Sequence, residues 1–414
     1  MFAEGLSEPL LRAVAEAGYQ EPTAVQHAVI PEVLAGKDVW AKASTGSGKT
    51  AAFVLPILEV LARDKLTLPR RTRALFLVPT RELATQTAAT IVALRTHLAQ
   101  RPKCVVVLGG VSINPQMMEL RGGAEIVVAT PGRLLDLVAK NALTLGSVAH
   151  LVLDEADRLL DNNFSEELAQ IVALLPPQRQ TLLFSATFSP AVSKLAKSLM
   201  REPVRIDVTD APADLPAIKQ RAIEVDTAKR TPLLRHLIEI HAWDRVLVFV
   251  ATQHATEHVT EKLKIGGINA LALHGKLSQG ARTRALDLFR SSSVHVLVAT
   301  DLAARGLDIT GLPAVINYDL PRSPNDYVHR IGRTGRAGET GIAISFITAE
   351  MRDHFALIER RHAHYIVRER IAGFEPTDEP TSRAAHAVNT TGGGIKGARK
   401  SKKDKLREAA ARKP

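Results

Sequence analysis

Residues 43–50, with the sequence ASTGSGKT, have the composition of a phosphate-binding loop. They lie between a short apolar run, residues 39–41, and a helical pattern. Backbone N–H groups at the start of a helix attract phosphate oxygens, and glycines let the backbone approach them closely. Lys49 can neutralise charge on the β- and γ-phosphates, and the Thr50 hydroxyl can ligate Mg²⁺. Although Ala43 stands where the usual pattern has glycine, these residues predict a nucleoside-triphosphate site rather than an ordinary turn.

Two carboxylates follow a second apolar run, residues 151–153. In nucleotide-hydrolysing folds with a phosphate loop, an Asp at such a strand end holds Mg²⁺, and a neighbouring Glu can orient and deprotonate the attacking water. Asp154 is therefore the predicted metal residue and Glu155 the predicted general base. An acidic strand end alone is more often a helix cap or a solvated turn, so this prediction depends on the phosphate loop.

Residues 329–336, HRIGRTGR, place three arginines among glycines in the second half of the chain. Planar guanidinium groups bind phosphate oxygens at two points, and the glycines let them approach a ligand. Because the phosphate loop lies in the first half, we expect this cluster to act as an arginine finger across a closing cleft. A surface cluster that binds RNA or acidic neighbours is the alternative.

Short apolar runs bounded by turn residues are the elements that would hold these groups. Runs this short and apolar throughout are typical of strands covered on both faces, and helical patterns between them favour right-handed βαβ units with a parallel sheet. The first series comprises residues 75–78, 105–108, 126–129, 151–153 and 182–184. The second comprises residues 246–250, 271–273, 294–299, 315–318 and 342–346. Residues 207–216, with two prolines, are the predicted linker between the two series.

The two series also resemble each other. LFLVPT at residues 75–80 is similar to LVFVAT at 247–252, and VAT at 128–130 recurs at 298–300. The two pairs have nearly the same offset, which predicts duplicated α/β domains. Chance is the alternative, because apolar strands often end in Thr.

Composition limits the class of protein. The 414 residues are 45% hydrophobic and 23% charged, as in soluble globular proteins, and no apolar run has the length of a membrane span. With one cysteine, Cys104, the chain forms no internal disulfide, and its start has no secretory signal, so a cytoplasmic location is expected.

Of the net charge of +11, residues 396–414 carry +7. Such a basic segment, in a Pro-, Thr- and Gly-rich tail expected to be disordered, favours nucleic acid as its partner, with solubility as the alternative.

The chain resembles a known family, the DEAD-box RNA helicases, over about residues 2–375. The resemblance rests on many short motifs in one order, which is far more specific than any motif alone. They are Gly18 and Tyr19 with Pro22, Thr23 and Gln26; residues 43–50; PTRELA at 79–84; Gly109 and Gly110; TPGR at 130–133; DEAD at 154–157; SAT at 185–187; VFV at 248–250; Gln279 with Arg282; residues 300–308; and 329–336. Residues 109–118 and 280–286 look most like the bacterial RhlE-like branch.

The resemblance implies two tandem RecA-like domains, each a mostly parallel sheet flanked by helices. The expected parts are an N-terminal ATP-binding domain at 1–207, a linker at 208–216, a C-terminal helicase domain at 217–375 and a basic disordered tail at 376–414.

The resemblance also implies the site residues. The adenine pocket would comprise Gln26, Thr23 and Tyr19, where Phe is more usual. The rest of the nucleotide would contact Ser44, Thr45, Gly46, Ser47, Gly48, Lys49, Thr50 and Asp308. The catalytic set would be Lys49, Glu155, Arg333 and Arg336, with Ser185 and Thr187 linking hydrolysis to RNA strain; Asp154 and Thr50 would hold the metal, and Asp157 would meet His329 across the cleft. The RNA contacts would be Thr80, Arg81, Gly110, Thr130, Gly132, Arg133, Gly275, Arg282 and Thr300.

The activity that this resemblance implies is ATP-dependent unwinding or remodelling of RNA duplexes and RNA–protein complexes, with ATP and Mg²⁺ as cofactors. With only 4% aromatic residues, we expect contacts to the RNA backbone rather than base stacking, and hence weak sequence specificity. An ATP-gated RNA clamp and a DNA helicase are the alternatives. The resemblance also implies a monomer whose protein partners are ribosome-assembly or RNA-decay factors, with no membrane partner.

Overall fold

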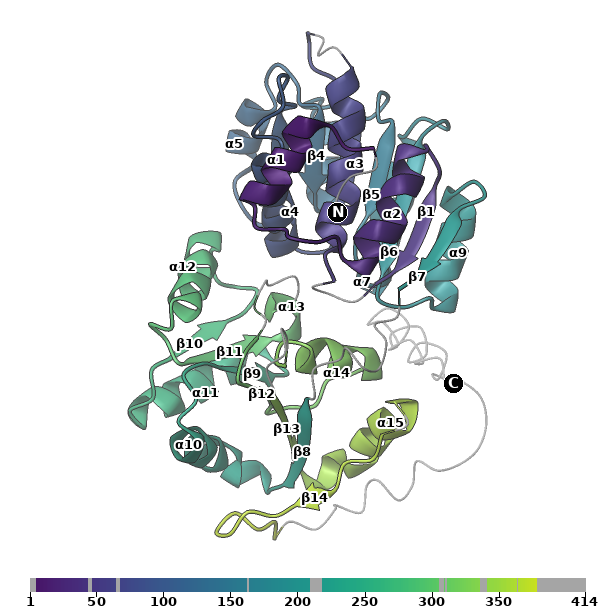
Figure 1. Ribbon diagram of the computed structural model, residues 1–414. Helices are drawn as coiled ribbons and strands as arrows, with labels where there is room; N and C mark the ends of the chain where they lie inside the picture. Colours follow the sequence, from purple (N-terminus) through teal and green to yellow (C-terminus); the bar gives the residue numbers. More distant parts are fainter. Residues whose placement is uncertain are drawn as a thin grey trace, which may run out of the picture. The chain divides into compact units, whose positions relative to one another are not determined.

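The computed structural model describes residues 5–43, 47–64, 68–161, 164–208, 218–304, 309, 311–335, 341–362 and 364–377. Within these ranges the chain forms two parallel sheets of seven strands each (Figure 1). The α/β class and the predicted parallel sheets are therefore confirmed. The predicted linker, apart from residue 208, and the tail beyond residue 377 lie outside the described residues, and the division into four parts stays a prediction.

The first sheet has the strand order β3-β4-β2-β5-β6-β1-β7. Its strands are β1 (Val39–Lys42), β2 (Ala74–Leu77), β3 (Cys104–Val107), β4 (Ile126–Ala129), β5 (His150–Leu153), β6 (Gln180–Ser185) and β7 (Val204–Asp207). Its helices are α1 (Glu8–Glu16), α2 (Ala24–Leu34), α3 (Lys49–Arg63), α4 (Arg81–Leu94), α5 (Ile113–Glu119), α6 (Pro131–Ala139), α7 (Ala156–Asp161), α8 (Ser165–Ala173) and α9 (Pro190–Leu199).

Strand β2 illustrates why these apolar runs fold as interior strands. Successive side chains point to opposite faces of a sheet, so a strand covered on both faces must be apolar throughout. Phe76 packs in the core under helices α1 to α4, whereas Leu75 and Leu77 pack in the core under α6 to α9. The side chains of this one short strand therefore pack against the helices on both faces of the sheet.

The second sheet has the order β10-β11-β9-β12-β13-β8-β14. Its strands are β8 (Lys219–Glu224), β9 (Val246–Val250), β10 (Ala270–Leu273), β11 (Val296–Thr300), β12 (Ala314–Asn317), β13 (Ile342–Ile347) and β14 (Arg368–Glu369). Its α-helices are α10 (Arg230–His241), α11 (Gln253–Ile265), α12 (Gln279–Arg290), α13 (Asp301–Ala304), α14 (Pro324–Ile331) and α15 (Arg352–His362), with short 3₁₀ turns η1 (Thr227–Lys229) and η2 (Ala349–Met351).

The predicted duplication agrees with the two strand orders. Strand β2 has the same place in the first sheet as β9 in the second, and β4 has the same place as β11. These are the strands whose sequences resemble each other. Thr80 and Thr252, which follow β2 and β9, each cap the next helix with the side-chain oxygen, at 3.3 and 3.1 Å.

Three strands were not predicted. In β7, partly buried residues alternate with exposed ones, because this strand lies at the edge of the sheet. In β8, the N-terminal half is polar. Strand β14 has two residues. None of them is a continuous apolar run, so the pattern used for the other strands misses them.

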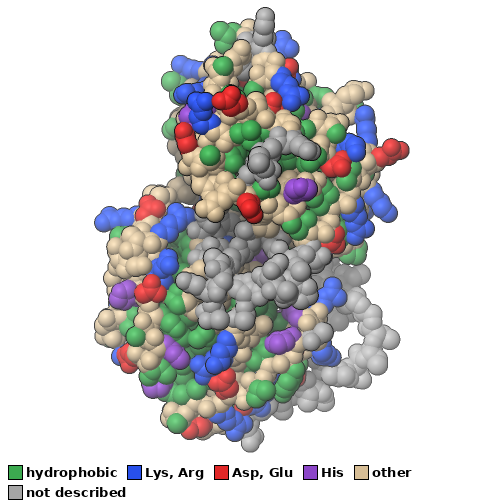
Figure 2. Space-filling view, viewed as in Figure 1, with side chains coloured by type: hydrophobic (Ala, Val, Ile, Leu, Met, Phe, Trp, Pro, Cys, Tyr) green, Lys and Arg blue, Asp and Glu red, His purple; other side chains and the backbone are tan. Residues whose placement is uncertain are grey.

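No helix in the described ranges is long and apolar enough to cross a bilayer. On the face shown in Figure 2, Lys and Arg side chains are interspersed with Asp and Glu rather than gathered in one patch. The distribution of charge alone therefore does not mark a binding surface on this face.

Candidate nucleotide and RNA site

Gln26 joins the start of helix α2 to the phosphate loop. Its Oε1 accepts a hydrogen bond from the Thr23 backbone N–H at 2.9 Å, and its Nε2 donates to the Gly48 carbonyl at 3.0 Å. Gly48 has a φ of +89°, and a Cβ there would lie 2.5 Å from Gln26 Nε2. A larger residue at Gly48 would therefore disturb both the loop and the predicted adenine pocket, in which Tyr19 is half-buried.

Lys49 begins helix α3, and its Nζ lies 3.6 Å from Asp154 Oδ1 at the end of β5. Both side chains are buried. Strands β1 and β5 are parallel and flank β6, so their carboxyl ends bring the phosphate loop and the acidic pair to one edge of the sheet. An oxygen donor set of Asp154 and Thr50, the residue after Lys49, suits Mg²⁺, which takes few protein ligands and completes its shell with water and phosphate.

No group of three or more His, Cys, Asp or Glu side chains is placed to hold a metal in the described ranges. A magnesium site made of one carboxylate, one hydroxyl and the nucleotide does not require such a group.

Glu155 is buried and has a left-handed backbone, with a φ of +51°. Its backbone N–H donates to Asp154 Oδ1 at 2.9 Å, which orients the Asp154 carboxylate relative to the Glu155 backbone. Burial raises the pKa of Glu155, and Lys49 opposes this shift. A carboxylate with a raised pKa is a stronger base than an exposed one, as a general base requires.

Ser185 and Thr187 form a tight loop at the end of β6. The Thr187 N–H donates to Ser185 Oγ at 3.2 Å, and the Ser185 carbonyl accepts from the Ala43 N–H at 3.1 Å. Thr187 Oγ1 is buried and has no hydrogen-bond partner in the described part of the chain. The loop therefore contacts the start of the phosphate loop directly.

Sequence reasoning missed the aromatic support of this loop. The rings of Phe188 and Trp40 meet edge to face, 4.7 Å apart between centroids. The Arg205 guanidinium lies 4.3 Å from the Phe188 ring and 5.2 Å from the Trp40 ring. Because Trp40 and Arg205 are paired on strands β1 and β7, the edge strand holds the residue that follows Thr187.

The predicted RNA residues of the first half lie after the carboxyl ends of β2, β3 and β4, before or at the start of the next helix. Thr80 starts α4, and Thr130 precedes α6 and accepts from the Gly109 N–H at 3.2 Å. Gly110 has a φ of +71°, and a Cβ there would meet the Arg81 guanidinium. Arg133 Nη1 is buried without a hydrogen-bond partner among the described residues. Together with Gly132, these groups place hydroxyls, helix N-termini and guanidinium groups on one side, a combination that suits phosphate.

The predicted RNA residues of the second half are Gly275, Arg282 and Thr300. Thr300 ends β11, and Gly275 lies near the Gln253 amide. Arg282 is buried and forms an ion pair with Glu82, at 2.6 Å between Nη2 and Oε1. Its guanidinium also donates to the carbonyls of His274 and Ala303, both at 3.4 Å. This ion pair joins elements of the two sheets.

A second ion pair between the halves, Arg158 with Asp326, was also not predicted. Asp326 is at the start of α14, the helix that carries His329 and Arg330. Burial lowers the pKa of His329 to about 3, with Arg158, Arg333 and Lys49 adding to the shift. No hydrogen bond joins His329 to Asp157 among the described residues, and Asp157 Oδ1 is buried without a partner there. The structure therefore has no hydrogen bond between these two side chains, and their meeting across the cleft stays a prediction.

Arg330 anchors helix α14 to its own sheet. Its guanidinium forms two hydrogen bonds with Asp301, at 2.6 and 2.7 Å, and donates to Asn317 at 3.0 Å. It also lies over the Phe249 ring, 4.8 Å from the centroid. Arg333, two residues after the helix, is buried, and its charge opposes part of the rise that burial causes in the pKa of Glu155. Of the predicted nucleotide residues, Ser44, Thr45, Gly46, Asp308 and Arg336 lie outside the described residues.

Comparison with known proteins gives two family matches, the DEAD/DEAH box helicase model over residues 23–195 and the helicase conserved C-terminal domain model over residues 228–338. The DEAD-box ATP-dependent RNA helicase CshA of Bacillus cereus is 40% identical over 86% of this chain and 67% of its own length. This chain therefore spans about two thirds of that relative.

The ATP-dependent rRNA helicase rrp3 of Sclerotinia sclerotiorum is 40% identical over 93% of this chain and 80% of its own length. Among solved structures, S. cerevisiae Dbp5 bound to RNA and ADP BeF3 has a TM-score of 0.78 at 31% identity, over 89% of this chain and 94% of that chain. The two sheets are therefore tandem RecA-like domains. The chain belongs to the DEAD-box family of ATP-dependent RNA helicases.

Proposed function

We propose that this helicase couples ATP hydrolysis to closure of its two sheets on single-stranded RNA, and that closure opens duplexes locally. The observation that carries the proposal is the buried group of Lys49, Asp154 and Glu155 at the edge of the first sheet. The groups that suit RNA phosphate begin helices along the same edge. A single movement of the second sheet toward this edge can therefore close the protein on both ATP and RNA.

The chemistry follows from these positions. Glu155 accepts a proton from the attacking water while the oxygen of that water bonds to the γ-phosphorus. The bond between the γ-phosphorus and the bridging oxygen breaks, and ADP is released. Lys49 neutralises phosphate charge, and Arg333 and Arg336 would stabilise the charge that develops on the γ-phosphate. Asp154 and Thr50 would hold Mg²⁺, which neutralises charge on the β- and γ-phosphates when bound.

RNA recognition would use the backbone. Hydroxyl, guanidinium and main-chain N–H groups bind phosphate and 2′-OH positions, which carry no base sequence. ATP and RNA each contribute binding energy to the closed state, so closure is favoured when both are present. A closed site that fits only a bent strand would separate that strand from its complement.

We further propose membership of the RhlE-like branch, supported by the sequences at residues 109–118 and 280–286. The proposed setting is a cytoplasmic monomer that acts with ribosome-assembly or RNA-decay factors. Nine basic residues between 396 and 414 would add contacts to RNA phosphate.

A clamp function is the second candidate, because the same site would serve it. Strand displacement and RNA retention should be measured side by side, with ATP and with a non-hydrolysable analogue. Duplex opening that requires ATP, with release of RNA after hydrolysis, supports the helicase. Slow displacement with long-lived RNA binding would support the clamp instead.

A further inference from the structure

A groove lies at the edge of the first sheet that faces away from the predicted nucleotide and RNA residues. It is formed by the segments that lead into β2, β4 and β5, at residues 69–72, 120–124 and 140–147, together with the end of α5. Thr80 and Thr130 follow the opposite ends of β2 and β4. Four strand residues span about 13 Å, so the groove is separate from those positions.

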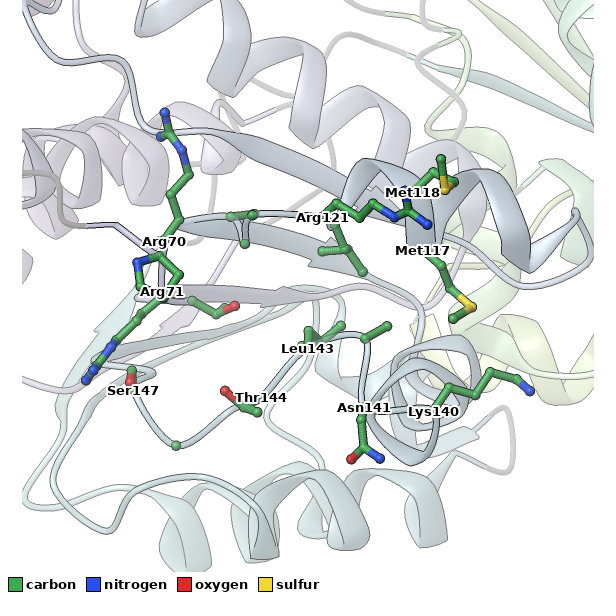
Figure 3. A pocket seen from close by; sticks show the side chains of 18 of the residues that line it. Arg70, Arg71, Met117, Met118, Arg121, Lys140, Asn141, Leu143, Thr144 and Ser147 are labelled. Atoms are coloured by element: carbon green, nitrogen blue, oxygen red, sulfur yellow. The ribbon is translucent and has the colours of Figure 1, made fainter.

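The groove has a volume of about 950 Å³, which is large enough for a stretch of peptide. Figure 3 shows Met117, Met118 and Arg121 on one wall and the loop with Leu143 and Thr144 on the other. Met118 is 55% exposed, while Leu143 is buried. Methionine side chains adapt to different apolar partners, so a partly exposed pair of them suits a binding surface.

The charges along this groove have one sign. It is lined by Arg70, Arg71, Arg121 and Lys140, and no carboxylate is among its lining residues. Arg70 is satisfied by Glu125, with hydrogen bonds of 3.0 and 2.9 Å. Within the described ranges no ion pair joins the other three to an acidic side chain, and all three are exposed.

Nucleic acid is a poorer match than protein for this groove. None of its lining residues is aromatic, so it offers no surface on which bases stack. Its partly exposed methionines can be covered by an apolar side chain of a partner, which a phosphate backbone does not provide. Acidic groups between apolar anchors would satisfy both the cations and the methionines.

We propose that this groove, lined by Arg71, Met117, Met118, Arg121, Lys140 and Leu143, docks an acidic segment with apolar anchor residues from a protein partner. The inference does not depend on the catalytic roles assigned above, because the groove shares no residue with the nucleotide or RNA sites. Docking at the far edge would leave the site open to ATP and RNA.

The test uses the full chain and a fluorescein-labelled peptide of repeated Glu-Leu-Asp units, with binding followed by anisotropy. A second peptide replaces each Leu with Ser. The groove variants are Arg71→Glu/Arg121→Glu and Met117→Ser/Met118→Ser. The control is Lys194→Glu/Lys197→Glu, which makes the same charge change at exposed residues of α9. RNA-stimulated ATP turnover verifies that each variant is folded.

We expect saturable binding of the Leu peptide that weakens at least tenfold in both groove variants and stays unchanged in the control. The Ser peptide should bind at least tenfold more weakly. No binding of the Leu peptide, equal weakening in the control, or equal binding of the Ser peptide would overturn the proposal. A tenfold loss of single-stranded RNA affinity in Arg71→Glu/Arg121→Glu would also overturn it and assign the groove to RNA.

Discussion

Glu155 combines burial, a fixed orientation and a nearby cation. Burial raises its pKa, the hydrogen bond from its own N–H to Asp154 fixes its backbone, and Lys49 lies close enough to oppose the shift. The sequence predicted that Asp154 and Glu155 directly follow an apolar strand, and both follow β5 in the structure. It did not predict the left-handed φ of +51°, because DEAD contains no glycine that would signal it.

Glu155→Gln should leave ATP affinity near that of the unsubstituted protein, because the amide has the same shape. Turnover should fall at least about a hundredfold, the scale of a lost general base. Single-turnover hydrolysis and nucleotide binding measured on the same preparation separate the two effects. Substantial remaining turnover would remove Glu155 from this role.

His329 gives a pH dependence with a definite sign. Its pKa is lowered to about 3 in the folded chain, so between that value and its ordinary 6.5 the unfolded state binds more protons. Stability therefore falls as pH decreases through 6.5, with a slope from this group alone that approaches about 1 kcal/mol per pH unit well below 6.5.

The measurement is urea unfolding at several pH values between 7.5 and 5 for the unsubstituted chain and His329→Asn. We expect the substitution to flatten the acid side of the profile. His150, whose pKa burial also lowers, is unchanged in both proteins and cancels in the comparison. Identical slopes for the two proteins would contradict a partly buried His329 that is neutral in the folded state.

Helix starts are the elements that carry the proposed RNA contacts. The Thr80 hydroxyl accepts from the Leu83 N–H at the start of α4, and its own hydrogen remains able to donate to a phosphate oxygen. Ser189 caps α9 in the same way, accepting from the Val192 N–H at 3.3 Å, but has no proposed RNA role.

Thr80→Ala and Ser189→Ala should each cost about 1 kcal/mol of stability, as cap removals do. Only Thr80→Ala should weaken RNA binding, by several-fold. Chemical denaturation and RNA titration of both variants distinguish the roles of the two caps. Equal RNA affinity in the two variants would limit Thr80 to capping.

The edge strand β7 supports the loop that contains Ser185 and Thr187. Arg205→Ala should remove the cation from Phe188 and Trp40, costing about 0.5–1 kcal/mol because the guanidinium is exposed. We expect fewer duplexes opened per ATP hydrolysed, with partial rescue by Arg205→Lys. Lys197→Ala, which removes an exposed cation of α9, serves as the control. An unchanged coupling ratio in Arg205→Ala would show that the loop does not need this support.

Element prediction from sequence succeeded where burial is simple. The runs that became β2, β4, β5 and β9 are apolar at every position, because helices cover both faces. Strand β7 escaped prediction because an edge strand is covered less completely and alternates. Its importance for Phe188 comes from pairing with β1, a long-range contact that no local pattern contains.

At the scale of the whole molecule, residues far apart in sequence meet in pairs. Glu82 with Arg282 and Arg158 with Asp326 join the two sheets. Motif order predicted that both halves contribute to one site. It did not predict these partners, since charge pairing depends on tertiary geometry rather than on spacing. Both pairs are buried or nearly so, so removing one side chain of either pair would take the closest opposite charge away from its partner and should lower stability.

The central claim is that RNA closes the two halves into an active ATPase. Steady-state ATP hydrolysis should be measured without nucleic acid, with single-stranded RNA and with single-stranded DNA, using Glu155→Gln to exclude contaminating activity. We predict strong stimulation by RNA, little by DNA and none in the variant. Equal stimulation by DNA, or the same turnover with and without RNA, would contradict the account.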